Sequence, residues 1–452
     1  MDNDTKPTEA NLINRRELLR STAVASAALV TAGASSAAAA PSRRGAPAIL
    51  RRQGGKLVVA MQNADQQAAQ PLIDEYAEAN GIEIEVQGFP FEGLLERLTI
   101  NLTQATGAYD VVSMDDPWMP QFAGGEFLMN LEELGYERDP DFVPELLALG
   151  DFPPGSGLRG IPWVGNVQVF AWRTDVLEEL GLEVPQTWDD VLNAAAAITE
   201  AKKSEDLYGF GLRGVAGNPA ATSFLPILRG HGGDLFDDNN DPKEPTLDTP
   251  EAQEALRKHL ELAKLAPPGV ENVQHADMGT NMYSGRIAMA ADIWPDLLLQ
   301  IWDPDISQVV GKVAIGPEPA QTGAESKNMT GNWLLGIPEG SQNPEQALDF
   351  IVWLTAPEQQ KRLLLDNNIP ATRTSVLTDQ EAVEKLPFLP GLLEAARKAV
   401  PRPRTPHYNA AEAIYGRYIA EAIAGQTSPE DALTNANKEI RDLMVREGVL
   451  ED

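Results

Sequence analysis

Apolar and polar positions change their period several times after residue 55. Residues 56–61 and 109–114 are short apolar runs that predict buried strands, and residues 82–86 alternate as in a half-exposed strand. Residues 66–80 have apolar side chains on one helical face and end before a glycine, and residues 91–106 also predict a helix. The order strand, helix, strand, helix, strand indicates an α/β unit with parallel strands.

The second half of the chain repeats both kinds of signal. Thr187 is followed three residues later by a carboxylate, which predicts a capped helix start. Thr249, Asn343 and Ser428 each precede a proline, which predicts three further helices with a capping side chain. Further strands are expected at 160–172, 286–290, 312–315 and 332–337. The whole chain after residue 55 is therefore expected to be α/β.

The N-terminal end has the order of an export signal. Arg15 and Arg16 precede the small, mildly apolar residues 21–40, which predicts a twin-arginine signal peptide at 1–40. The alternatives are a tail that contains two arginines by chance, or an uncleaved membrane helix. Residues 41–55 are expected to be a flexible lead-in. We therefore expect a protein that works in the periplasm or at the cell exterior.

Composition excludes several classes of partner and cofactor. The formal net charge is −31, and this excess of carboxylates disfavours nucleic acid and anionic lipid as partners. The chain has no cysteine, which excludes disulfides, thiolate metal sites and a lipid anchor on cysteine. Its four histidines form no ligand-spaced pair, and no cofactor motif is present. We expect no metal, no cofactor and a monomer.

Five separated segments place aromatic or polar side chains at the ends of expected strands. They are residues 62–65, 115–118, 162–168, 291–294 and 331–333. Ligands of open α/β sheets bind outside the carboxyl ends of the strands, so these segments are candidates for one site.

The same segments belong to a longer pattern. Its parts are Tyr109–Asp115, residues 160–175, residues 180–190, Gly232–Phe236, Tyr283–Trp294, residues 343–354 and Ile369–Arg373. In this order and spacing the chain resembles the extracellular solute-binding proteins of carbohydrate ABC importers, family 1, which includes maltose-type and polyol-type receptors. Residues 171–173 and Ile293 depart from the family's usual residues, which leaves the identity of the substrate open.

The resemblance implies a two-lobed periplasmic-binding-protein fold of type II. The ligand would lie in the cleft between the lobes, and a hinge of crossing strands would join them. The N-lobe would comprise 56–167 plus 313–366, and the C-lobe 168–312 plus 367–452. The crossings would lie near 166–170, 312–315 and 369–372.

Sugars present apolar C–H faces and a rim of hydroxyls, which suit aromatic rings and planar polar side chains. The candidate ligand-binding residues are Gln62, Asn63, Asp65, Asp116, Trp118, Trp163, Asn166, Asp292, Trp294, Asn332, Trp333 and Arg373. The tryptophans have core packing as their alternative, and the first-loop residues have helix capping. Of Asp115 and Asp116, one is expected to accept from the ligand and the other to form a turn or cap, with Asp116 favoured for the ligand. The alternative for Arg373 is a surface salt bridge.

The function expected from the resemblance is capture of a sugar or polyol and its delivery to ABC permease subunits, without catalysis. A secreted glycosidase is the alternative from another class, because Asp115, Asp116, Asp292 and Glu318 include possible carboxylate pairs. A ligand-sensing adaptor is a third interpretation.

Overall fold

The computed structural model describes residues 55–451, and these belong to one unit that extends from Arg52 to Asp452. The expected signal peptide at 1–40 lies outside the described residues, and so does the expected lead-in at 41–55 except for its last residue. Within the described part of the chain, no helix is both long and apolar enough to cross a membrane.

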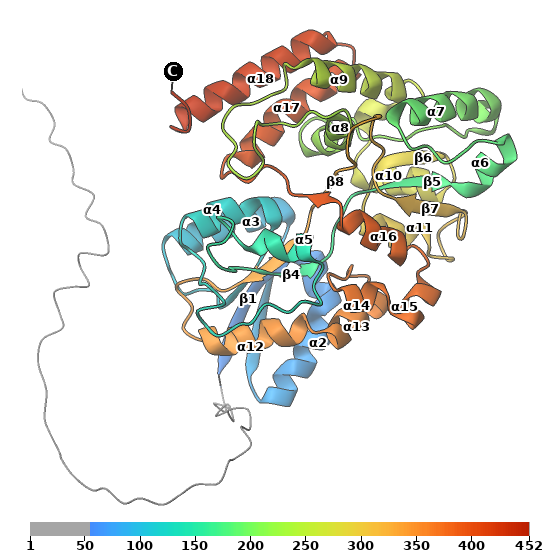
Figure 1. The fold of residues 1–452 in the computed structure, drawn as a ribbon. Helices are drawn as coiled ribbons and strands as arrows, with labels where there is room; N and C mark the ends of the chain where they lie inside the picture. The colour runs from blue at the N-terminus through green and yellow to red at the C-terminus, as the bar shows by residue number, and fades with distance from the viewer. Residues whose placement is uncertain (1–54, 452) are drawn as a thin grey trace, which may run out of the picture. The chain divides into compact units, whose positions relative to one another are not determined.

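The first sheet has five strands in the order β2-β1-β3-β9-β4. These are β1 Lys56–Gln62, β2 Glu83–Phe89, β3 Val111–Asp115, β4 Ile161–Val164 and β9 Trp333–Gly336. Strand β1 pairs in parallel with β2 and β3, as the alternation of strand and helix predicts, whereas β9 runs antiparallel to β3 and β4. The helices of this first lobe are α2 Asn63–Asn80, α3 Phe91–Thr103, α4 Met119–Gly124, α5 Pro144–Leu147, α12 Pro344–Leu354 and α13 Pro357–Asn367. Helices α3 and α4 lie on one side of this sheet and α2 and α12 on the other (Figure 1).

The second sheet has three antiparallel strands in the order β6-β5-β7. These are β5 Val169–Arg173, β6 Met289–Ile293 and β7 Val313–Gly316. The helices of this second lobe are α6 Thr174–Leu180, α7 Trp188–Lys202, α8 Asn218–Gly230, α9 Pro250–Ala263, α10 His275–Tyr283, α11 Pro295–Ile301, α14 Thr374–Leu377, α15 Gln380–Lys385, α16 Leu389–Ala396, α17 Tyr408–Ile423 and α18 Pro429–Arg446. Each lobe has its own buried apolar cluster. The expected α/β fold with two lobes is confirmed.

The boundary expected at residue 313 is wrong. Strand β7 pairs with β5 of the second sheet from Phe170 to Arg173, and its Val313 side chain is buried in that lobe. The chain returns to the first lobe only after the short strand β8 (Asn328–Met329), which pairs with β10 (Ala399–Val400). A short apolar strand fits either sheet equally well by its pattern, so the sequence could not choose between them.

Three crossing segments at 165–168, 329–332 and 369–372 join the two lobes and bond to one another. Gly165 N donates to Pro370 O at 2.8 Å, and Gly331 N donates to Asn166 O at 2.9 Å. Gln168 N donates to Met329 O at 3.0 Å. The second crossing therefore lies at 329–332 rather than at the expected 312–315.

The predicted helix starts are confirmed, but one predicted capping side chain does not cap its helix. Thr187, Thr249 and Ser428 each accept a backbone hydrogen bond through the side chain, at α7, α9 and α18. Asn343 precedes α12 as expected, but its amide donates to Lys56 O of β1 at 3.2 Å and makes no cap. This side chain ties α12 to the first strand instead.

Candidate functional site

A cavity of about 430 Å³ lies between the two lobes, a volume typical of small-molecule sites. Its first-lobe lining consists of Gln62, Phe91, Asp115 and Trp333, and Asn166 and Gly331 come from the crossing segments. Arg213, Asn218, Thr222, His275, Trp294, Asp296 and Arg402 complete the lining. Several of these residues stand at strand ends, where an α/β sheet places its ligands.

The first-lobe wall of the cavity is aromatic. The rings of Phe91 and Trp333 lie edge to face, with their centroids 6.1 Å apart. Trp118, in the short helix η1 (Asp116–Trp118), packs against both rings at 5.6 and 5.4 Å. Trp118 is only 1% exposed and does not line the cavity, whereas Phe91 is 41% exposed. Trp118 therefore supports the wall, and Phe91 and Trp333 form its surface.

Trp294 forms the opposite wall, on the second lobe. Its Nε1 donates to Asp292 Oδ1 at 2.9 Å, which fixes the orientation of the indole. The ring lies against Gly331, where a β-carbon would come within 2.5 Å of Cζ3. The close approach of indole and backbone therefore requires glycine at this position.

Asp292 is a buried organiser and does not line the cavity. Its carboxylate accepts from Gln168 Nε2 at 2.6 Å, from Ser223 Oγ at 3.0 Å and from Arg213 Nη2 at 2.8 Å. Arg213 Nε donates to the second oxygen. These contacts hold Arg213 and Trp294 in fixed positions at the cavity.

A second arginine–carboxylate group lies on the other side of the cavity. Arg402 Nη2 donates to Asp115 Oδ1 at 2.5 Å and to Asp116 Oδ1 at 3.1 Å. Burial raises the pKa of Asp115 to about 7, against the opposing charge of Arg402 and with the help of the neighbouring Asp116. Arg402 is thus one buried cation that is shared by the carboxylates of Asp115 and Asp116.

Asp116, the favoured ligand residue of the pair, is buried and does not line the cavity. Its backbone N donates to Asn332 O at 2.9 Å, and its Oδ2 accepts from Asn332 N at 3.0 Å. Asn332 in turn donates through Nδ2 to Asn166 O at 2.9 Å. Asp116 and Asn332 thus connect the end of β3 to the crossing segments, and Asp115 is the carboxylate that lines the cavity.

His275 and Asp296 line the cavity on the second lobe, at the first turns of α10 and α11. His275 Nε2 lies 2.7 Å from Asp296 Oδ2, and both side chains are partly exposed. The pair adds polar groups to the rim of the cavity.

Asn63 and Asp65 stand in the first turn of α2, and neither lines the cavity. Asn63 is exposed, and no side chain caps this helix. Asp65 Oδ2 is enclosed and has no hydrogen-bond partner among the described residues, and burial raises the pKa of this carboxyl to about 7. Of the first loop, only Gln62 reaches the cavity.

Two further candidates have structural contacts away from the cavity. Trp163 is fully buried in β4 and donates from Nε1 to Ser113 Oγ at 3.0 Å. Arg373 pairs through Nη1 with Asp139 Oδ2 at 2.6 Å and lies over the Phe142 ring, 4.0 Å from its centroid. Its Nε donates to a backbone carbonyl, so this arginine is held within the protein and does not reach the cavity.

The candidate set did not include several residues that line the cavity. They are Phe91, Asp115, Arg213, Asn218, Thr222, His275, Asp296, Gly331 and Arg402. Phe91 comes two residues after the end of β2, so the strand-end rule could have found it. Arg213 and Arg402 lie in connecting segments without periodic pattern, and no sequence signal marks them.

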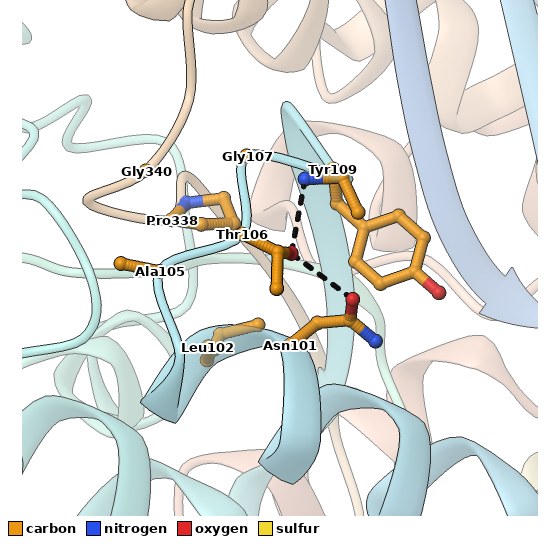
Figure 2. Close-up of a pocket in the computed structure, with 9 residues that line it drawn as sticks. Asn101, Leu102, Ala105, Thr106, Gly107, Tyr109, Pro338 and Gly340 are labelled. Atoms are coloured by element: carbon orange, nitrogen blue, oxygen red, sulfur yellow. Dashed lines mark hydrogen bonds between the residues drawn. The ribbon is translucent and has the colours of Figure 1, made fainter.

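A much smaller pocket lies at the end of α3 (Figure 2). It is lined by Asn101, Leu102, Ala105, Thr106, Gly107, Ala108, Tyr109, Pro338 and Gly340. Thr106 Oγ1 donates to Asn101 Oδ1 at 3.0 Å across it, and the volume of about 10 Å³ suits one water molecule at most. Within residues 55–451 no group of three or more His, Cys, Asp or Glu side chains is arranged to hold a metal ion.

Two lobes joined by three crossing segments, with a polar and aromatic cavity between them, define a two-lobed protein of the ligand-binding class. The family of bacterial extracellular solute-binding proteins matches residues 62–361. This chain therefore belongs to that family, as the resemblance predicts.

Individual relatives extend over nearly the whole described chain. A probable amino-acid ABC transporter periplasmic-binding protein of Sinorhizobium fredii is 24% identical, over 87% of this chain and 90% of its own length. The solved structure of an ABC transporter solute-binding protein of Agrobacterium radiobacter K84 in complex with ribitol is 26% identical. It covers 86% of this chain and 99% of its own, with a TM-score of 0.77. A maltose-bound protein of T. maritima has the same identity and coverage, with a TM-score of 0.75.

Proposed function

We propose that this protein is the ligand-binding component of an ABC importer and that its ligand is a sugar or a polyol. The observation that carries the proposal is a cavity with an indole on each lobe, Trp333 and Trp294, and hydrogen-bonding groups between them. The two solved relatives hold ribitol and maltose, which are ligands of this chemistry. Apolar C–H faces suit the indoles, and hydroxyls suit the arginines, carboxylates and amides of the cavity.

The name of the Sinorhizobium fredii relative suggests an amino acid as the alternative ligand. An α-carboxylate needs a cation that it can pair with inside the cavity. The two arginines of the described lining are already paired, Arg213 with Asp292 and Arg402 with Asp115 and Asp116. A neutral polyhydroxyl ligand is therefore the better match to this cavity.

Delivery to the permease would use closure of the lobes. The cavity takes residues from both lobes, so a bound ligand contacts both and favours the arrangement in which both contacts exist. The crossing segments at 165–168, 329–332 and 369–372 would bend during this motion. We propose that a single chain carries out this cycle as a monomer, because one chain supplies the whole lining described above.

The proposal includes export by the twin-arginine route and no lipid anchor on cysteine, as the sequence predicts. It also includes the absence of catalysis. A glycosidase needs two carboxylates that are free to act on one bond, as acid and as base or nucleophile. Asp116 and Asp292 have their oxygens engaged by Asn332, Arg213, Arg402 and other donors, which favours a structural role for both.

The test is a thermal-shift screen of the full chain with ribitol, D-mannitol, maltose and a set of L-amino acids. A sugar or polyol at a hundred times its dissociation constant is expected to stabilise the fold by about 2.7 kcal/mol. Stabilisation by amino acids with no response to any carbohydrate would overturn the ligand class. Turnover of nitrophenyl glycosides by substoichiometric protein would overturn the binding function itself.

A further inference from the structure

Arg402 reaches the cavity from the connection between β10 and α17. Arg229 of the second lobe holds the start of this connection, because its Nη2 donates to Pro401 O at 2.9 Å. Helix α17, which follows, packs into the second-lobe core through Tyr408 and Tyr415. Arg402 is therefore anchored to the second lobe on both sides.

The carboxylates that Arg402 contacts belong to the first lobe. Asp115 is the last residue of β3, and Asp116 begins η1 directly after it. The Arg402 and Asp115 side chains both line the cavity and are nearly fully buried. This ion pair consequently links the lobes at the point where a ligand would contact both.

Each partner of the Arg402–Asp115 pair has one polar atom left over. The hydrogen bonds of Arg402 to described residues use Nε and Nη2, and those of Asp115 use Oδ1. Nη1 of Arg402 and Oδ2 of Asp115 thus have no partner among the described side chains and backbone. These are the remaining donor and acceptor atoms of two side chains that hydrogen-bond each other and line the cavity.

We propose that Arg402 Nη1 and Asp115 Oδ2 bind two adjacent hydroxyls of one ligand, so that the protein selects neutral ligands with a vicinal diol. One hydroxyl accepts from the guanidinium and its neighbour donates to the carboxylate, which matches the order of donor and acceptor on the protein. This inference rests on the proposed function and names the chemical feature of the ligand that the cavity recognises.

The Arg213–Asp292 group cannot bind a diol in the same way. Both oxygens of Asp292 are engaged by described residues, by Arg213, Ser223, Gln168 and Trp294. The Asp292 carboxylate therefore offers no free acceptor beside Arg213. The proposed requirement for two adjacent hydroxyls therefore applies to the end of the ligand that lies at Arg402 and Asp115.

The same pair discriminates against acids and deoxy ligands. A ligand carboxylate at this place would meet Asp115, a like charge, while Arg402 is already shared by two carboxylates. A ligand without the two hydroxyls would leave a buried donor and a buried acceptor unsatisfied, which is costly. Both effects favour the neutral diol.

The experiment measures dissociation constants by calorimetry for three neutral ligands and their acids: ribitol and D-ribonate, D-mannitol and D-mannonate, maltose and maltobionate. The proteins are the full chain, Asp115→Asn, Arg402→Lys and the double variant. Arg404→Lys is the matched control, because Arg404 lies in the same segment and donates to Leu149 O of the first lobe but does not line the cavity.

The unchanged protein is expected to bind the neutral ligand of each pair at least tenfold more tightly than the corresponding acid. Asp115→Asn should weaken the neutral ligand on the order of tenfold and leave the acid unweakened, because it removes the negative charge while keeping the shape. Arg402→Lys should weaken the neutral ligand on the order of 10- to 100-fold, and the double variant should be no weaker than the worse single variant. Arg404→Lys should keep the preference of the unchanged protein.

Equal weakening of neutral ligand and acid in Asp115→Asn would overturn the inference, because loss of structure alone acts on both. Tighter binding of the acid by the unchanged protein would overturn it as well. If a folded protein binds none of the six compounds, the proposed function fails and this inference fails with it. Neutral binding with an unaltered preference in every variant would leave the proposed function standing and exclude the diol element.

Discussion

The indole of Trp294 lies so close to Gly331 that a β-carbon on residue 331 would come within 2.5 Å of the ring atom Cζ3. The contact joins the second-lobe wall of the cavity to a crossing segment. A side chain at residue 331 would therefore displace the indole or shift the crossing segment.

Gly331→Ala is expected to weaken ligand binding at least tenfold, because the new methyl group pushes Trp294 from its position against the ligand. Calorimetry with the ligand found in the sugar and polyol screen measures this change. Gly93→Ala is the control, since Gly93 lies in α3 and a β-carbon added there would have its nearest neighbour atom 3.9 Å away. That helical substitution should stabilise the fold by roughly 0.5–1 kcal/mol and leave affinity unchanged. Equal affinities of Gly331→Ala and the unchanged protein would contradict the packing role of this glycine.

Glu318 is expected to lower the stability of the protein as the pH rises. Both of its carboxyl oxygens are buried and have no hydrogen-bond partner within residues 55–451. Burial raises the pKa of Glu318 well above its ordinary value, and the nearby Asp292 carboxylate raises it further. The folded state then holds a proton that the unfolded state releases above its own pKa of about 4.5, so the free energy of unfolding falls with increasing pH above that value.

Glu318→Gln removes this titration, so the variant should unfold at a higher temperature than the unchanged protein at pH 8, and the difference should shrink toward pH 4.5. Thermal unfolding followed by circular dichroism measures both. Glu325→Gln, at an exposed position of the same loop, should show no such difference. A variant less stable than the unchanged protein at pH 8 would show that the carboxylate has a stabilising partner.

Arg373→Ala is expected to destabilise the fold by roughly 3 kcal/mol, because it leaves a backbone carbonyl without its donor, removes the cation paired with Asp139 and empties the space over the Phe142 ring. Ligand affinity should stay within twofold of that of the unchanged protein at a temperature where the variant is folded. Denaturant unfolding and calorimetry separate the two quantities. A large loss of affinity with unaltered stability would return Arg373 to the ligand site that the sequence predicts for it.

Ligand affinity is expected to rise about tenfold between pH 6 and pH 8. The pKa of Asp115 is about 7 in the free protein, and only the ionised carboxyl offers Oδ2 as a full acceptor. The groups that act on this carboxyl are Arg402, which favours ionisation, and Asp116 and Glu412, which oppose it. The same raised pKa lowers stability as pH rises, so affinity and stability should change in opposite directions.

Calorimetry over this pH range measures the affinity, and Asp115→Asn should give a flat profile. His275→Gln is the second control, because the His275–Asp296 pair also lines the cavity. A slope that persists in Asp115→Asn and disappears in His275→Gln would contradict the assignment of the pH dependence to Asp115.

The sequence was informative wherever a local pattern has one physical meaning. Apolar runs and capping residues predicted the strands of the first sheet and the starts of α7, α9 and α18. The strand-end rule placed Gln62, Asn166, Trp294 and Trp333 at one site, and all four line the cavity. Parallel strands bring their carboxyl ends to one edge of the sheet, so this outcome needs no tertiary information beyond the fold class.

Other parts of the site depend on contacts between distant segments. Asp115 and Asp116 are adjacent acidic residues that the sequence pattern cannot tell apart. In the structure, Asp116 makes two hydrogen bonds with Asn332, and Asp115 is the carboxylate that lines the cavity. Strand β7 could have joined either sheet, and its pairing with β5 decided its lobe.

The sequence by itself determined the class of fold, the family, and the strand ends that line the cavity. The tertiary structure decided that Arg373 pairs with Asp139 away from the cavity, and that Arg402, far along the chain, completes the cavity lining. The physical reason is that periodicity and capping are local properties of a segment. The partner of a charged side chain is set by which segments the two lobes bring together.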